Sequence, residues 1–241
     1  MTYAEMQHVP AIFLIVTGAG VSVVTHKLTF FGALAGVVIA FSIYFFAGYT
    51  GLIMLASFFI TGTFATSWRK KDKQNRLNKS GYQSKRSMNQ VLANAAVPSL
   101  IACFIYIDPA NANLYQLVIA GSLASATADT LSSELGMIYG RRFYNVLSLK
   151  TEAKGLDGVI SLEGTLIGCA GATLIAFIYS LGYGFNHGFW MVIFAGTAGN
   201  LTDSILGAAL ERKNLMTNDM VNFLSTVSAA VTTWFLSYLT I

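Results

Sequence analysis

The sequence predicts an all-α, polytopic integral membrane protein with about eight transmembrane helices. Of its 241 residues, 54% are hydrophobic and only 11% are charged, whereas soluble domains carry roughly 25% charged residues. Long segments lack Asp, Glu, Lys and Arg altogether, and about 20 apolar residues are enough for one helix to cross a bilayer. We therefore expect a single membrane domain over residues 1–241, in a multi-pass integral membrane protein.

Six uncharged runs supply the expected spans. Four have the length of one helix, and two are long enough for two helices each. The runs cover residues 6–26, 28–68, 87–107, 109–128, 164–202 and 220–241. Pro10 marks the start of the first helix near Val9, since proline is favoured in the first helical turn. We expect the two long runs to break at the glycine-rich segments 48–51 and 182–188.

The basic residues predict the orientation. When the chain alternates sides through eight spans, all fifteen Lys and Arg fall on one face. They are Lys27, Arg69, Lys70, Lys71, Lys73, Arg76, Lys79, Lys85, Arg86, Arg141, Arg142, Lys150, Lys154, Arg212 and Lys213. The positive-inside rule makes this face cytoplasmic and places both termini on the other side. We expect two cytoplasmic loops, a basic loop at 69–86 and a second loop at 141–158.

The basic loop at 69–86 has two interpretations. It can set the topology and attract anionic lipid headgroups, or it can hold an anionic substrate. Because the net charge of +4 follows from the topology, it does not indicate nucleic-acid binding. Cys103 and Cys169 lie within apolar runs and form neither a disulfide framework nor a metal-ligand cluster.

Four acidic residues lie at or inside apolar segments: Asp129, Glu134, Glu163 and Asp203. An acid at the centre of a membrane helix costs about 2.5–3.5 kcal/mol on insertion scales, and it is a candidate functional group by default. On the eight-span topology, all four lie near the cytoplasmic ends of spans five, six and seven. We therefore expect them to converge at one depth.

Helical spacing groups these acids with other polar residues, because steps of three or four residues share a helix face. One face carries Ser125, Asp129, Ser132, Gly136 and Gly140, and a second carries Gly196, Asn200, Asp203 and Gly207. If the two faces meet, their oxygen ligands suit Mg²⁺, and no Cys or His favours zinc or copper. Glu134 completes the candidate metal set of Asp129, Glu134, Asn200 and Asp203. It lies roughly 140° around a regular helix from Asp129, so the two would share an ion only if the helix broke between them.

The segment between these two helices has the composition of an anion site. It carries basic, glycine and hydroxyl residues, which are Lys150, Lys154, Gly155, Gly158, Ser161, Gly164 and Thr165. Backbone N–H groups and the dipole at a helix N-terminus favour a phosphate, as do nearby ammonium groups. Arg141 and Arg142 precede this segment. The spacing is not that of a Walker A loop.

Structural interpretations of the same residues stay open. Asp129 can be an acid that hydrogen-bonds between helices, and Glu163 can be a first-turn acid favoured by the helix dipole. Arg141 and Arg142 can be anchors whose charged ends reach the membrane surface.

Two other classes of function also stay open. An ion-coupled transporter or channel would use Asp129, Glu134 and Asp203 as an ion path. Spans five and seven support it, because both end in an Asp-Thr/Ser-Leu/Ile element, a glycine and a basic pair, as in a parallel repeat. A structural or lipid-binding membrane protein is the third class, but polar groups at this density are unexpected there.

Four motifs carry a resemblance to a known family. They are Asp129-Thr-Leu-Ser-Ser-Glu134-Leu-Gly136, which includes Ser132 and Ser133, and the segments 90–94, 155–165 and 199–208. The sequence resembles an integral membrane family, long known as a domain of unknown function, that includes animal transmembrane protein 19 and the plant phytyl-phosphate kinase. It is more distantly similar to polyprenol kinases and CDP-diacylglycerol synthases, which share the order of an Asp…Gly element, a basic residue and a Lys…Gly-Ser/Thr element.

The resemblance implies phosphoryl transfer from a nucleoside triphosphate, CTP or ATP, to an isoprenyl monophosphate of the phytyl or geranylgeranyl type. Such transfer needs positioning and charge neutralisation more than covalent chemistry. The implied catalytic residues are Asp129, Asp203, Lys150 and Lys154, with Asn200 helping to hold Mg²⁺. The implied phosphate contacts are Arg141, Arg142, Ser132, Ser133, Gly155, Gly158, Ser161, Gly164 and Thr165. The lipid tail would lie between helices beside the glycine-rich faces. Expected partners are the lipid, the nucleotide and the membrane, with a homodimer as an option and no nucleic acid.

Overall fold

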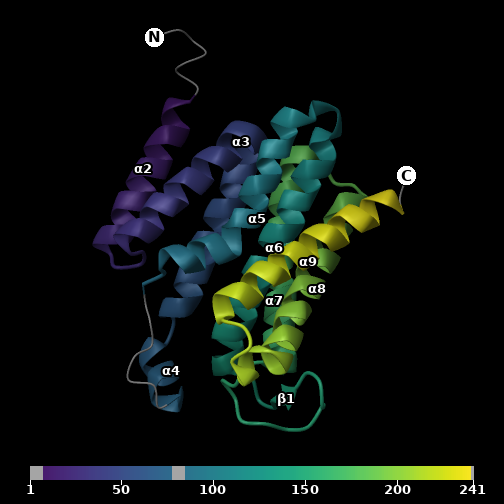
Figure 1. Ribbon diagram of the computed structural model, residues 1–241. Coiled ribbons are helices and arrows are strands. Elements are labelled where there is room, and N and C mark those ends of the chain that lie inside the picture. Colours follow the sequence, from purple (N-terminus) through teal and green to yellow (C-terminus); the bar gives the residue numbers. More distant parts are fainter. Residues whose placement is uncertain (1–7, 78–84, 240–241) are drawn as a thin grey trace.

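Helices make up nearly all of the regular structure in the computed structural model, which describes residues 8–77 and 85–239. The long helices are α2 (Val9–Val24), α3 (Phe30–Ser67), α5 (Met88–Ile107), α6 (Ala112–Tyr139), α7 (Leu162–Tyr183), α8 (His187–Ala209) and α9 (Asn218–Tyr238). The short elements are α4 (Lys70–Leu77), the 3₁₀ turns η1 (Pro109–Asn111) and η2 (Glu211–Lys213), and the strands β1 (Tyr144–Asn145) and β2 (Val159–Ile160). The predicted all-α class is confirmed (Figure 1).

Both long uncharged runs break where the sequence predicts. Helix α3 is interrupted at Gly48, whose φ of 68° and ψ of −163° are not helical. Glycine adopts this region readily because it has no Cβ, so α3 consists of two helical halves. The second run is broken between α7 and α8, where Gly184 has a φ of 91° and Asn186 caps α8 by accepting a hydrogen bond from the Gly188 N–H at 2.7 Å.

Among the described residues, four helices are long and apolar enough to cross a membrane: α3, α5, α7 and α9. Helix α2 is apolar but has only 16 residues. The other two long helices, α6 and α8, are those that carry Asp129, Asn200 and Asp203. These findings support a polytopic membrane protein, and the count of eight crossings stays a prediction.

The basic segments gather at one end of the bundle. Figure 1 shows α4 and the β1 loop at this end, and the start of α2 and the end of α9 lie away from it. The backbone N–H of Arg86 donates to the Lys27 carbonyl at 2.9 Å, and Lys27 Nζ donates to Ser67 Oγ at 2.7 Å. Arg212 Nη1 forms an ion pair with Glu152 Oε2 at 2.8 Å. Segments far apart in the sequence therefore meet here, as the charge pattern requires.

Helix α6 is the central element, and it packs against α3, α5, α7, α8 and α9. Every residue from Leu117 to Ala128 is buried, and most of them are small. Small side chains let neighbouring helices approach closely. The buried part of α6 leads directly to Asp129, so the bundle fixes the position of this acid.

Candidate functional site

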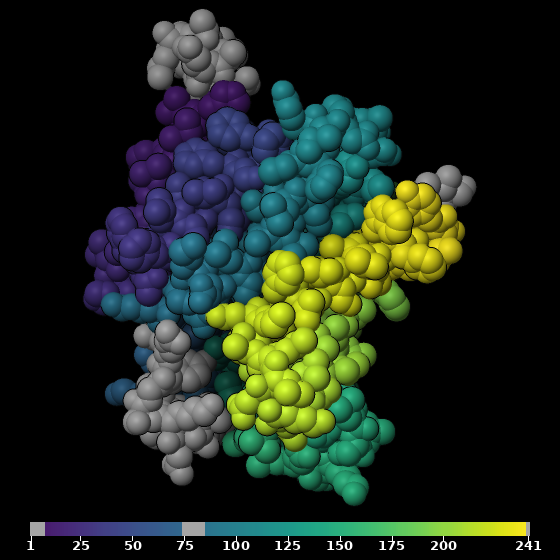
Figure 2. Space-filling model, viewed as in Figure 1, coloured from purple at the N-terminus to yellow at the C-terminus, as the bar shows by residue number. Residues whose placement is uncertain are grey.

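A polar cavity of about 470 Å³ lies at the basic end of the bundle. It is formed by the ends of α5, α6, α7, α8 and α9 that meet there, together with the loop between β1 and α7. In Figure 2 the surface is hollowed beside the first half of α9. The polar lining comprises Thr66, Arg86, Gln90, Asn94, Asp129, Thr130, Ser132, Ser133, Glu134, Asp157, Asn200, Asp203, Ser204, Asn218 and Asn222, among others.

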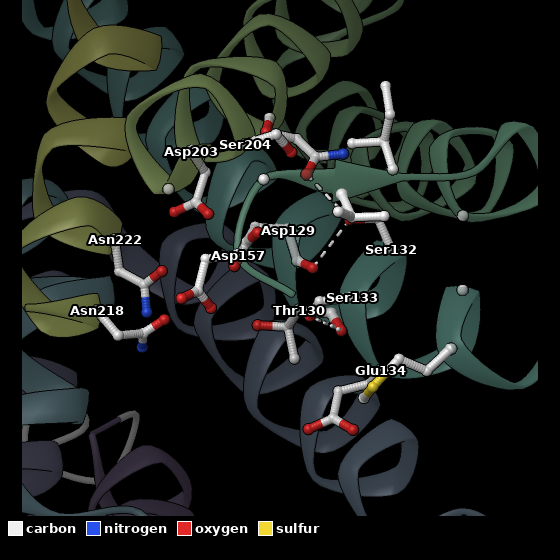
Figure 3. A pocket seen from close by; sticks show the side chains of 18 of the residues that line it. Asp129, Thr130, Ser132, Ser133, Glu134, Asp157, Asp203, Ser204, Asn218 and Asn222 are labelled. Carbon is white, nitrogen blue, oxygen red and sulfur yellow. Dashed lines mark hydrogen bonds between the residues drawn. The ribbon is translucent and has the colours of Figure 1, made fainter. Parts of the chain in front are cut away.

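The two polar faces predicted on α6 and α8 meet in this cavity. Ser132 Oγ donates a hydrogen bond to Asn200 Oδ1 at 2.9 Å. The carboxyl groups of Asp129 and Asp203 lie close enough to interact directly, and Figure 3 shows both directed into the same space. Within the described residues, Asp203 Oδ2 is buried and has no hydrogen-bond partner. A buried carboxylate oxygen without a partner is costly, so this atom fits a cation or a ligand proton.

The donor set around Asp129 and Asp203 consists of carboxylate, amide and hydroxyl oxygens. No group of three or more His, Cys, Asp or Glu that could hold a metal ion occurs in residues 8–77 and 85–239. Mg²⁺ is usually bound by one or two carboxylates together with substrate phosphates, rather than by a complete protein cage. The two carboxylates and Asn200 fit that mode of binding, and they do not fit a zinc centre.

Glu134, the remaining candidate metal ligand, also lines the cavity, but its carboxylate pairs with Lys73 and is directed away from Asp129. Helix α6 runs unbroken through it to Tyr139, so Glu134 points away from Asp129, as Figure 3 shows. Its Oε2 accepts a hydrogen bond from Lys73 Nζ at 2.6 Å. Lys73 Nζ also donates to the Ala65 carbonyl at 2.6 Å, and its side chain is 0% exposed. This buried ion pair ties α4 to α3 and α6 at the rim of the cavity.

The loop after β1 folds over the cavity. Strands β1 and β2 pair antiparallel, and Gly155 and Gly158 have φ values of 81° and 69°. Gly158 packs directly on α8, where a Cβ would collide with Ala208. Arg212 Nε donates to the Asp157 carbonyl. The loop is therefore held against α8, and this contact brings residues 155–158 to the cavity.

The basic residues predicted to bind phosphate lie outside the cavity wall. Lys150, Arg141 and Arg142 are exposed on the loop, and Lys154 is half-buried; none of the four lines the cavity. The backbone N–H of Arg141 donates to Glu163 Oε2 at 3.3 Å. Arg86 lines the cavity instead.

The start of α7 uses its hydroxyl groups locally. Ser161 Oγ accepts from the Gly164 N–H at 3.1 Å and so caps the helix. Thr165 Oγ1 donates to the Ser161 carbonyl at 3.0 Å. Glu163 lies in the first turn, in agreement with its structural interpretation. Gly164, Ser161 and Thr165 nevertheless line the cavity.

Several lining residues were not assigned to the site from the sequence. The sequence places Arg86 in the basic loop and Gln90 and Asn94 in a family motif, and no motif marks Asn218 and Asn222 as site residues. A local signal exists for these, because Gln90 and Asn94, like Asn218 and Asn222, are four residues apart and share a helix face. The Lys73–Glu134 pair has no such signal, since its members are 61 residues apart.

The glycine-rich faces of α6 and α8 are filled by other helices. A Cβ on Gly196 would lie 2.7 Å from the Ala124 Cβ, and one on Gly199 would collide with Ser125. These glycines allow close helix packing and leave no room for a lipid tail. The expected position of the tail therefore does not fit the structure.

Gly168→Ala tests the packing that holds Asn200 in place. A Cβ at this position would lie 2.7 Å from Asn200 Nδ2 and 3.0 Å from the Ser132 Cβ. We expect the free energy of unfolding in detergent to fall by about 1–3 kcal/mol, which is the usual cost of overpacking. Gly20→Ala is the control, because nothing lies within 4 Å of its new Cβ. Equal stability of the two variants would contradict tight packing around Asn200.

The chain is similar to several membrane proteins. A family model described as "Integral membrane protein DUF92" matches residues 13–230. An uncharacterized membrane protein of Methanocaldococcus jannaschii is 33% identical over 201 residues, which are 83% of this chain and 82% of that protein. Protein VTE6, chloroplastic, of Arabidopsis thaliana is 28% identical over 186 residues, which are 74% of this chain and 56% of VTE6. Protein PGR of the same plant is 28% identical over 207 residues, 75% of this chain and 70% of PGR. No solved structure matches significantly.

Proposed function

Because this chain belongs to the DUF92 family of integral membrane proteins, we propose that it is a membrane kinase of phosphorylated lipids. It transfers a phosphoryl group from a nucleoside triphosphate, CTP or ATP, to an isoprenyl monophosphate. The products are the isoprenyl diphosphate and the nucleoside diphosphate. The resemblance to the family of the plant phytyl-phosphate kinase supports this acceptor class, and a plant relative, Protein VTE6, chloroplastic, is 28% identical to this chain.

The observation that carries the proposal is the pairing of Asp129 with Asp203 in a polar cavity at the basic end of a membrane bundle. Two adjacent carboxylates, one with a buried oxygen that lacks a partner, favour a bound cation. A divalent cation bound by few protein ligands keeps open positions that phosphate oxygens fill. The phosphate oxygens of a nucleoside triphosphate can fill these positions. On this proposal, the nucleotide enters from the side on which the basic residues gather.

The chemistry asks little of the protein beyond placement. An oxygen of the acceptor monophosphate attacks the γ-phosphorus, a new P–O bond forms, and the bond from that phosphorus to the β-phosphate bridging oxygen breaks. The acceptor is already anionic at neutral pH, so no strong general base is required. Mg²⁺, when bound, would neutralise charge on the triphosphate.

Each group of residues has a separate part in this step. Asp129 and Asp203, with Asn200, would hold the metal ion. Residues 155–158 would cover the phosphates, since they line the cavity. Lys150 and Lys154 precede that segment on the same loop, and we assign them to the nucleotide phosphates.

A transfer assay tests the proposal. Purified protein in detergent receives Mg²⁺, γ-labelled nucleotide and geranylgeranyl or phytyl phosphate, and we expect label in the lipid diphosphate. Removal of Mg²⁺ with a chelator should abolish the transfer. If no label enters lipid with any of the four nucleotides over a range of chain lengths, the proposal is wrong. An ion flux that depends on Asp129 in proteoliposomes would then favour the transporter.

A further inference from the structure

A second cavity, of about 510 Å³, lies between α2, α3 and α5. Its lining is almost entirely hydrocarbon, with residues such as Ile15, Val37, Leu52 and Phe59. Small-molecule sites have volumes of roughly 300–1,000 Å³, so this cavity can hold a ligand of substantial size. An apolar lining of this kind suits a hydrocarbon chain.

The two cavities share two polar residues, Arg86 and Gln90. They lie next to the boundary between the polar space that contains Asp129 and Asp203 and the apolar space between α2, α3 and α5. A ligand that filled both cavities would have a hydrocarbon part, a region beside a guanidinium and an amide, and a polar part directed to the carboxylates. A phosphorylated isoprenoid has this order of groups.

Arg86 is held firmly at the boundary. Its guanidinium lies 5.4 Å from the ring centre of Phe58 and 6.0 Å from that of Phe59. A Cβ on Gly62 would lie 2.6 Å from Arg86 Nη2 and 3.2 Å from Thr130 Cγ2, so the guanidinium packs where α3 approaches α6. The Arg86 backbone N–H donates a hydrogen bond to the Lys27 carbonyl, and the Arg86 carbonyl accepts one from the Thr29 N–H. An arginine guanidinium has five N–H donors and can bind a phosphate with two parallel hydrogen bonds.

We propose that the apolar cavity binds the isoprenyl chain of the acceptor and that Arg86 binds the acceptor's monophosphate at the boundary between the two cavities. This assignment rests on the proposed function and adds to it the position of the acceptor. The nucleotide then occupies the polar cavity from the side of the loop 155–158. The acceptor phosphate then meets the triphosphate beside Asp129. This residue adjoins Thr130 on α6, and Thr130 lies close to the Arg86 guanidinium.

Three glycines allow a test without steric damage to the protein. A Cβ on Gly18, Gly20 or Gly36 would meet nothing within 4 Å. Gly18 and Gly36 line the apolar cavity, whereas Gly20 does not. Leucine at position 18 or 36 therefore fills part of the cavity, and Gly20→Leu is the matched control.

The first readout is chain-length preference in the transfer assay. We expect Gly36→Leu to raise the KM for the 20-carbon acceptor phosphate roughly tenfold. A loss of affinity of this size is expected when about two methylene groups of the chain can no longer be buried. The KM for a 10-carbon acceptor and for the nucleotide should stay unchanged. Gly20→Leu should keep the wild-type profile. A wild-type profile in both Gly18→Leu and Gly36→Leu would overturn the assignment even if the enzyme is active.

The second readout does not need turnover. Geranylgeranyl phosphate should raise the melting temperature of wild-type protein more than geranylgeraniol does, and Arg86→Gln should remove this difference. Gly36→Leu should reduce both shifts. If wild-type protein transfers no phosphate yet shows these shifts, the proposed function fails and the lipid site stands. If phosphatidic acid stabilises the protein as well as geranylgeranyl phosphate does, the cavity binds membrane lipid and the assignment is wrong.

Discussion

Asp129→Asn and Asp203→Asn are each expected to lower kcat by about a thousandfold, since a bound metal ion stabilises transition-state charge by several kcal/mol and about 1.4 kcal/mol corresponds to a factor of ten. Asparagine keeps the shape of the side chain but loses the charge that would hold Mg²⁺ in the proposed site. The bundle should remain folded, because the substitution removes no apolar contact. Turnover at saturating Mg²⁺, together with the melting temperature, measures both effects.

Asp219→Asn is the matched control for these variants. Asp219 lies in the first turn of α9, next to Asn218, but it does not line the cavity. Its loss changes the charge at the same end of the molecule without touching the proposed metal ligands, so turnover should stay near wild type. Near-wild-type turnover in both Asp129→Asn and Asp203→Asn would exclude a metal site on these residues.

Lys73→Met is expected to lower the free energy of unfolding by about 3–5 kcal/mol, the usual effect of removing one member of a buried ion pair. The Lys73 side chain is 0% exposed and that of Glu134 is 15% exposed. Without Lys73, the Glu134 carboxylate would lose its charged partner, and the Ala65 carbonyl would lose a hydrogen bond.

Unfolding of the purified protein in mixed detergents measures this loss. Lys71→Met is the control, because Lys71 lies on the same helix and is exposed; it should change stability little. The double variant Lys73→Met/Glu134→Gln should recover part of the lost free energy of unfolding, since it no longer has a Glu134 carboxylate that lacks Lys73. A Lys73→Met variant as stable as Lys71→Met would show that the pair is not important for stability.

The sequence predicts those parts of the fold and of the site that depend on local spacing. Uncharged runs and glycines locate the helices and the breaks at Gly48 and Gly184, because length and backbone freedom are properties of short segments. Steps of three and four residues place Asp129 with Ser132 and Asn200 with Asp203 for the same reason. That the two faces meet follows from the need to bury polar groups together.

Contacts between distant segments could not be predicted in this way. Lys73 and Arg86 belong to one basic stretch in the sequence, yet one is buried against Glu134 and the other lines both cavities. Their positions depend on how α4 and α5 pack against α3 and α6, which no local pattern encodes. Lys150 is close in sequence to glycines that reach the cavity, but it is exposed and does not line the cavity, so its contact with the nucleotide stays a prediction.

The short connections at the end of the bundle opposite α4 and β1 have a consequence for how substrates would reach the proposed site. The chain reverses there at Gly48, at Asp108 with the η1 turn, and between Gly184 and Asn186. Within residues 8–77 and 85–239, these turns are short and supply no loop that could cover a substrate. On the proposed function, the nucleotide and the lipid diphosphate would therefore enter and leave at the end that carries α4 and β1, where the polar cavity lies. If the proposed function is correct, enzymes that supply the acceptor or consume the product would work from that same side of the membrane.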